Sequence, residues 1–120
     1  MKTSSAKQKG RLLQQLVQKK LLESFEQFTV NDIKSTSMGC QGADVQLSQV
    51  ALDLLKIQIE CKNRAAIAVY KDYEQAQTHG NVEPVLIIKQ NRSKPLAVID
   101  LDYFIQLLKR STVNDNREAL

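Results

Sequence analysis

The sequence predicts an α/β protein with a mixed central β-sheet flanked by helices. Its 120 residues suit one ordinary domain, and 42% hydrophobic with 25% charged residues is the composition of a folded globular chain. Segments with the helical period of about 3.6 residues alternate along the chain with segments of period two. Their order, αβ(α)βαββα, is typical of a mixed sheet with helices packed on it, in the α/β or α+β class.

The first half of the chain predicts one long helix, two short strands and one short helix. Apolar residues recur near the helical period over 4–28, with polar residues between them. The segments 29–34 and 44–47 indicate short strands because β-branched or alternating apolar residues dominate them, and a polar loop with glycines separates the two. Ser48 is a suitable cap for a short helix over 49–55.

The second half begins with the best-defined strand, over 56–62, where apolar and polar residues alternate strictly. The apolar set must face the core and the other set a polar surface. A helix, two strands and a last helix follow, over 65–78, 85–89, 96–100 and 103–110. We expect residues 1–110 to form a single domain and residues 111–120, which lack periodicity, to form a flexible tail.

The net charge of +4 is concentrated at the beginning of the sequence, where the first twenty residues carry six basic side chains and no acidic one. Such a segment fits nucleic acid or an anionic membrane surface, and equally a solvated helix. No apolar stretch reaches the roughly 18 residues of a membrane span, so we expect no membrane association. Two cysteines argue against a disulfide scaffold, and a cytoplasmic location is expected.

The candidate chemistry lies on the polar face of the 56–62 strand, where Glu60 and Lys62 project side by side. The tripeptide alone is weak, because Asp32-Ile33-Lys34 has the same form. Only the first has a lone aspartate, Asp44, at the start of the preceding strand. If those strands pair, two carboxylates meet, and Mg²⁺ relieves their repulsion; the alternative is an ordinary surface salt bridge.

Asp44, followed by Glu60-Cys61-Lys62 on a strand and then by a helix, resembles the PD-(D/E)XK nuclease superfamily, although Ala43 stands where the family name has proline. Over roughly residues 9 to 108 the chain is most similar to archaeal-type Holliday junction resolvases and small phage-encoded relatives. The similarity includes Lys9-Gly10, Ser37-Met38-Gly39 and the segment Lys89-Gln90-Asn91-Arg92-Ser93-Lys94. It implies a restriction-endonuclease-like core and a homodimer that hydrolyses phosphodiester bonds of branched DNA, in the host cytoplasm if phage-encoded.

The resemblance also implies roles for particular residues. Asp44, Glu60 and the backbone carbonyl of Cys61 would hold Mg²⁺, for which Mn²⁺ would substitute, and Lys62 would orient the nucleophile. Ser37 and Gln75 would assist them as part of the catalytic set. Where the resolvases have a further glutamate on the first helix this chain has Gln14, which favours one metal ion. Positive or polar residues expected to contact DNA are Lys9, Arg11, Asn63, Arg64, Lys71, Arg92 and Lys94.

Two other functions remain open at this stage: a general, flap-directed or sequence-directed nuclease of the same fold, and a non-catalytic DNA-binding module. The side chain of Cys61 is expected to be a small buried hydrophobe. His79 precedes a glycine at an expected helix end, where its ring suits the helix dipole, and it is not expected to be catalytic.

Overall fold

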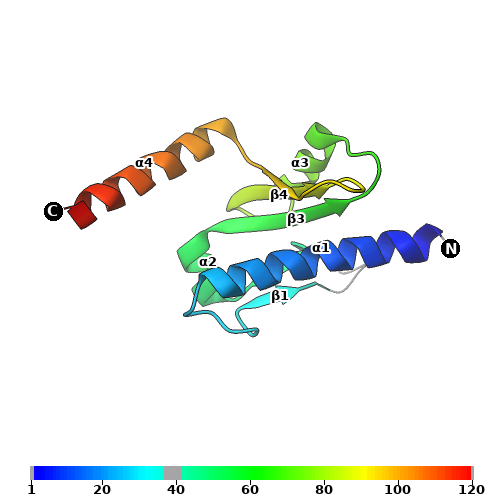
Figure 1. The fold of residues 1–120 in the computed structure, drawn as a ribbon, viewed down its shortest axis with the longest axis horizontal. Helices are drawn as coiled ribbons and strands as arrows, with labels where there is room; N and C mark the ends of the chain where they lie inside the picture. The colour runs from blue at the N-terminus through cyan, green and yellow to red at the C-terminus, as the bar shows by residue number, and fades with distance from the viewer. Residues whose placement is uncertain (1, 37–41, 120) are drawn as a thin grey trace.

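A computed structural model describes the chain over residues 2–36 and 42–119. It is an α/β protein with a five-stranded mixed sheet flanked by helices, as the sequence predicts (Figure 1). The helices and strands are α1 Lys2–Ser24, β1 Ile33–Ser35, β2 Val45–Leu47, α2 Gln49–Leu55, β3 Ile57–Asn63, α3 Val69–Gln77, β4 Glu83–Lys89, β5 Leu96–Val98 and α4 Leu101–Ala119.

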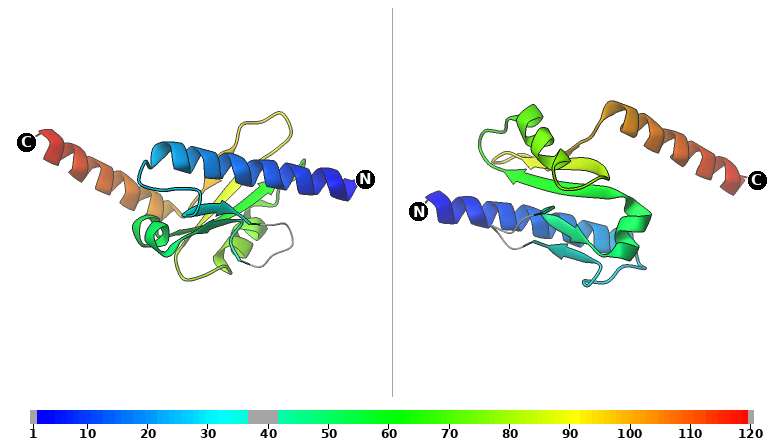
Figure 2. Two further views of the ribbon diagram at one scale, coloured as in Figure 1. Left: turned by 90° about the horizontal axis from the view of Figure 1, so that it is seen from below. Right: turned by 180° about the vertical axis from the view of Figure 1, so that it is seen from behind.

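The strands lie in the order β1-β2-β3-β4-β5, so β3 is the central strand. β2 runs antiparallel to both of its neighbours, β1 and β3. β3 and β4 are parallel, and β5 runs antiparallel to β4. A parallel pair needs a crossover connection, and α3 supplies it. α1 covers one face of the sheet and α3 the other (Figure 2). β3 is therefore enclosed on both faces and both edges.

The core lies between α1 and the sheet, where Leu13 of α1 packs with Ile33, Ile59 and Cys61. The strict alternation of β3 is confirmed, because Ile59 and Cys61 face this core while the intervening residues face α3. The second set forms a polar face, as expected, but this face is covered by the protein. Glu60 is only 3% exposed, because α3 and the segment after it pack on that face.

α1 and α3 differ from their predicted limits. α1 ends at Ser24, whereas Phe25 and Phe28 continue the apolar pattern from outside the helix, with ring centroids 5.6 Å apart. Phe28 is buried in the core, so the pattern over 4–28 reports packing beyond the helix. α3 begins at Val69, four residues later than expected, and Ala68 before it offers no side-chain cap.

The predicted helix cap at Ser48 is confirmed, because its hydroxyl accepts a hydrogen bond from Ala51 N at the start of α2. Asp100 plays this part for α4, because its carboxylate accepts from Tyr103 N at 3.1 Å. α4 then continues to Ala119, so the segment expected to be a tail is helical, while its flexibility stays a prediction. Within the described ranges, no helix combines the length and apolarity of a bilayer span.

Candidate active site

Asp44, Glu60 and Lys62 come together where β2 meets the middle of β3. Asp44 lies just before β2, and its backbone N donates to Ile59 O of β3 at 2.8 Å. Its side chain then reaches along β3, where Oδ2 accepts from Cys61 N at 2.7 Å. Two hydrogen bonds to one strand thus fix this carboxylate within electrostatic range of Glu60 and Lys62, which we call the Glu60 pair.

Glu60 has a basic side chain as the partner of each of its two oxygens. Lys62 Nζ lies 3.1 Å from Oε2, and His79 Nε2 lies 2.5 Å from Oε1. With Glu60 ionised, Nε2 must carry the proton of this hydrogen bond, because a carboxylate only accepts. The Glu60 side chain is 4% exposed, and its two partners are 18% and 15% exposed. The salt bridge is therefore largely buried and is not the surface pair weighed as the alternative.

His79 is the site residue that the sequence reasoning assigned only to the end of a helix. α3 ends at Gln77, and His79 lies in the connection to β4, where it turns back over β3. Gln58 holds this connection at both ends: its Nε2 donates to Ala76 O at 2.8 Å and its Oε1 accepts from Val82 N at 3.3 Å. The signal for this contact in the sequence is Gln58, a further polar residue on the strand face of Glu60. It lies two positions before Glu60 and holds the segment that carries His79.

Gly80 fits the same arrangement for a steric reason. A Cβ atom at this position would lie 2.8 Å from Gln58 Oε1, closer than real Cβ contacts allow. Any larger residue would push on the amide that holds both ends of the connection. The short segment that carries His79 is therefore positioned by one buried glutamine and by the absence of a side chain at residue 80.

Burial is the main cause that raises the pKa of Asp44, and the neighbouring Glu60 carboxylate raises it further. The hydrogen bond from Cys61 N opposes this most strongly, with Lys62 and His79 adding smaller contributions in the same direction. Burial also raises the pKa of the Cys61 thiol, so this sulfur is an inert core atom, as expected.

The oxygen ligands that a divalent cation needs are present in part. In an extended strand the N–H and C=O of one residue point to the same edge, and Cys61 directs its N–H toward Asp44, so its carbonyl lies on that side too. Two carboxylates and a carbonyl are oxygen ligands of the kind Mg²⁺ prefers. Across the described ranges, however, no three His, Cys, Asp or Glu side chains converge as a metal-binding group. Each Glu60 oxygen already has one partner, Lys62 or His79, so a cation would bind at a remaining lone pair or displace one of these partners.

A cleft of about 760 Å³ adjoins this site, lined at one end by Lys62 and Arg64 and along α3 by Lys71 and Gln75. Arg64 donates to Asp72 Oδ1 at 3.0 Å, which fixes the guanidinium at the cleft. Gln75 is exposed and shares the cleft with Lys62. The cleft thus has three cationic side chains, while Asp72 and Glu74 also line it, and this small positive excess suits a polyanion that approaches the Glu60 pair.

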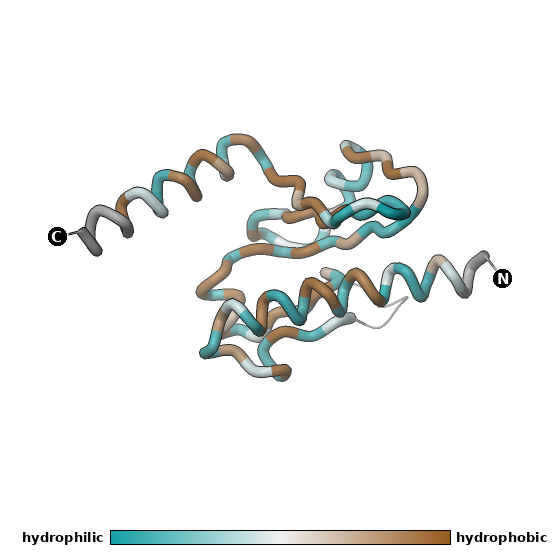
Figure 3. The backbone as a smooth tube through the Cα atoms, in the orientation of Figure 1, coloured by the Kyte–Doolittle hydropathy of each residue, from teal (hydrophilic) through white to brown (hydrophobic). Residues whose placement is uncertain are grey.

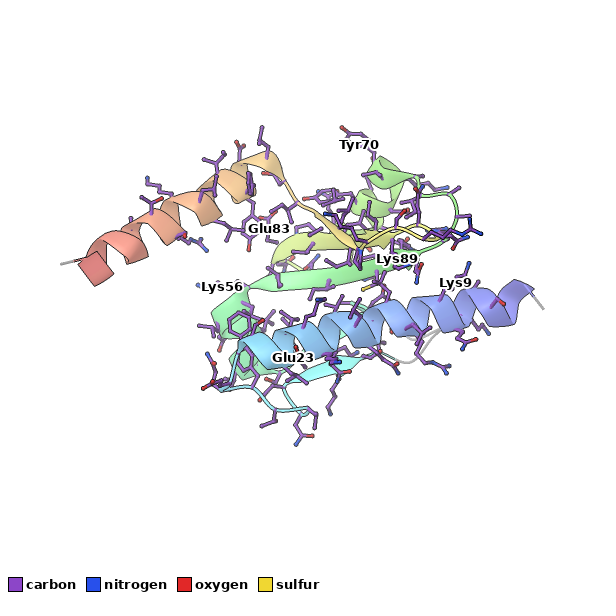
Figure 4. The ribbon with its side chains drawn as sticks, viewed as in Figure 1. Lys9, Glu23, Lys56, Tyr70, Glu83 and Lys89 are labelled. Carbon is purple, nitrogen blue, oxygen red and sulfur yellow. The ribbon has the colours of Figure 1, made fainter. Side chains whose placement is uncertain are left out.

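A second, smaller cleft of about 310 Å³ lies beyond the end of β3, between α1 and the β4–β5 turn. Lys9 Nζ donates to Asn91 Oδ1, and Asn63 Nδ2 donates to the Lys9 carbonyl, both at 2.9 Å. Lys9 and Lys89 point from different elements at this end of the molecule (Figure 4). The expected DNA contacts Lys9, Asn63 and Arg92 line this cleft.

The other predicted residues lie apart from these two clefts. Arg11 and Lys94 are exposed and line neither, and Ser37 lies outside the described residues. Gln14 is buried, and its Oε1 accepts from Ser35 Oγ at 2.9 Å. It is therefore a polar group bonded inside the α1–sheet layer.

Asp32-Ile33-Lys34, the second acidic-x-Lys tripeptide, has a structural explanation. Asp32 Oδ1 accepts from Ser48 Oγ and Oδ2 from Thr29 N, both at 2.8 Å. The carboxylate thus ties the turn before β1 to the start of α2, while Ile33 is fully buried and Lys34 is exposed. The hydrogen bond from Thr29 N, followed by that from Ser48, lowers the pKa of Asp32. The tripeptide serves the fold and lies away from the Glu60 pair.

Comparison of the chain with protein-family models, with curated proteins and with solved structures finds no match. The arrangement of Asp44, Glu60, Lys62 and His79 is therefore interpreted from its own geometry.

Proposed function

We propose that this protein is a Mg²⁺-dependent DNA endonuclease with a restriction-endonuclease-like core, resembling the Holliday junction resolvases. One observation carries the proposal: Asp44, just before β2, and the Glu60–Lys62 pair on the adjacent antiparallel strand β3 lie together beside a cleft with a small excess of cationic side chains. The antiparallel β1-β2-β3 unit, the crossover through α3 and the parallel β4 are compatible with that core. Preference for branched DNA rests on the sequence resemblance alone.

In this proposal Asp44, Glu60 and the Cys61 carbonyl would hold the cation. When bound, Mg²⁺ would supply Lewis acidity and lower the pKa of a coordinated water. Lys62, once its ammonium leaves Glu60 Oε2, offsets the charge that grows on the phosphate oxygens. His79 donates from Nε2 to Glu60 Oε1 and so holds this carboxylate in place while no substrate is present.

Lys62 lines the first cleft and Asn63 the second, so the two clefts lie on opposite faces of the sheet near the end of β3, because consecutive side chains of a strand alternate between faces. Arg64 and Lys71 on one side and Lys9 and Arg92 on the other would follow the phosphate backbone without selecting bases. DNA binding should therefore weaken steeply as salt is added. A binding constant that is insensitive to salt would remove these residues from the proposed interface.

A second candidate is a non-catalytic DNA-binding module of the same fold. The observation that favours it is the double occupation of Glu60, whose two oxygens already bind Lys62 and His79. In that case the buried pair stabilises the domain, and the cationic clefts alone provide the function.

A cleavage panel separates these candidates. Purified protein is incubated with duplex, single-stranded, flap and four-way-junction DNA in Mg²⁺, Mn²⁺ or EDTA. We expect cleavage that depends on the metal, that is lost in Glu60→Gln and Lys62→Ala, and that is unchanged in the control Lys34→Ala, while all variants still bind DNA. Salt-sensitive binding with no cleavage of any substrate would establish the binding module, and cleavage by Glu60→Gln would falsify the catalytic assignment.

A further inference from the structure

Among the described residues, half of the exposed large apolar side chains lie on α4. This helix extends away from the sheet (Figures 1 and 2) and makes at most marginal contact with other elements. Apolar turns recur along it (Figure 3). Four large apolar side chains follow the i, i+3, i+4, i+7 spacing and so form one stripe, defined by Leu101 at 71%, Phe104 at 46%, Ile105 at 52% and Leu108 at 49% exposure.

The stripe points away from the rest of the domain. Tyr103, half-buried at the start of α4, lies within electrostatic range of Glu83 on β4 and thus marks the side that faces the body. At 100° per residue, its direction differs from the centre of the stripe by roughly 150°. No rotation of side chains can bury the stripe against its own sheet, and an apolar surface of this extent in water is typical of a protein–protein interface.

Charges beside the stripe indicate which partner it fits. Asp102 and Lys109 are both exposed, and because seven residues make two turns they lie on the same flank of the stripe. The other flank carries Leu107 and Ser111, which have no charge. In an antiparallel pair of identical helices, each flank faces the same flank of the partner helix, which runs in the opposite direction. Each Asp102 therefore faces the partner's Lys109. In a parallel pair the charged flank would meet the uncharged one.

We infer that α4 is a homodimerisation helix that pairs antiparallel with α4 of a second copy through the stripe. The twofold axis passes near Ile105, and two symmetric ion pairs between Asp102 and Lys109 border the apolar contact. The inference rests on α4 alone and holds whether or not the protein cleaves DNA.

Sedimentation equilibrium of the full chain at micromolar concentration, without DNA, tests the dimer. Ile105→Glu places a charge in the stripe, and we expect the dimer dissociation constant to rise at least about tenfold. Gln106→Glu adds the same charge to the next, exposed residue outside the stripe and should leave the constant unchanged. A monomeric wild-type protein, or a dimer unaffected by Ile105→Glu, overturns the inference.

A charge exchange tests the orientation. Asp102→Lys and Lys109→Asp each bring like charges together, and each should weaken the dimer by about three- to tenfold. The combined Asp102→Lys/Lys109→Asp variant restores opposite charges in the antiparallel pair and should return to wild-type affinity. Far-UV circular dichroism verifies that every variant is folded. Failure of the combined variant to recover overturns the antiparallel arrangement.

Discussion

Replacing Lys62 by methionine should destabilise the protein, because it leaves the Glu60 carboxylate buried without one of its partners. The Lys62 Nζ to Glu60 Oε2 distance is 3.1 Å and the Glu60 side chain is 4% exposed. Removing one member of such a pair costs about 3–5 kcal/mol. His79 Nε2 still forms a hydrogen bond with the other oxygen, and Lys62 is 18% exposed, so water reaches the vacated position. We therefore expect a loss of about 3 kcal/mol in the free energy of unfolding, at the low end of that range.

Urea denaturation, followed by far-UV circular dichroism without divalent cations, measures this loss. A second variant, Glu60→Gln/Lys62→Met, has no buried charge to strand and should lose only about 1 kcal/mol, within the cost of a neutral hydrogen-bonding group. Lys34→Met is the matched control, because Lys34 is exposed on β1, and it should change stability by less than about 0.5 kcal/mol. The reasoning is refuted if Lys62→Met is no less stable than the double variant.

Three further outcomes test the surroundings of the site. Gln58→Leu removes both bonds to the α3–β4 connection and should lower the free energy of unfolding by about 2–3 kcal/mol, whereas exposed Gln46→Leu should have little effect. Hydrogen bonds lower the pKa of Asp32, so its stabilisation is present above pH 3.8 and lost as pH falls through the lowered pKa; Asp32→Asn should destabilise at pH 7 but not in strong acid. Burial raises the pKa of Cys61, so in a Cys40→Ser background iodoacetamide should label it only after denaturation.

Alternation and capping determined much of this fold locally. The period of two in β3 follows from the backbone of an extended strand, so the sequence alone placed Glu60 and Lys62 on one face. The Ser48 cap is equally local, because the hydroxyl bonds to an amide three residues later. Asp44 beside β3 needed one further assumption, the pairing of neighbouring strands, which the structure contains.

The limits of the elements were less predictable, because apolar residues serve the core inside and outside helices. Phe28 continues the apolar period of α1 although it lies beyond the end of this helix, because Phe28 and the apolar side of α1 both pack into the core between α1 and the sheet. Two acidic-x-Lys tripeptides were indistinguishable by composition, and only the contacts of Asp32 with Ser48 and Thr29 assign its carboxylate to the fold.

The sequence by itself therefore determined the class of the fold, the alternation of β3 and the placement of Glu60 and Lys62 on one face of it, because each depends on residue patterns within short segments. Only the tertiary structure decided that Glu60 is buried and that His79, nineteen residues further along the chain, occupies its second oxygen. It also decided that α4 extends from the sheet with its apolar stripe exposed. The physical reason is that periodicity identifies the face that is apolar, whereas the element that covers it depends on the path of the chain between distant segments.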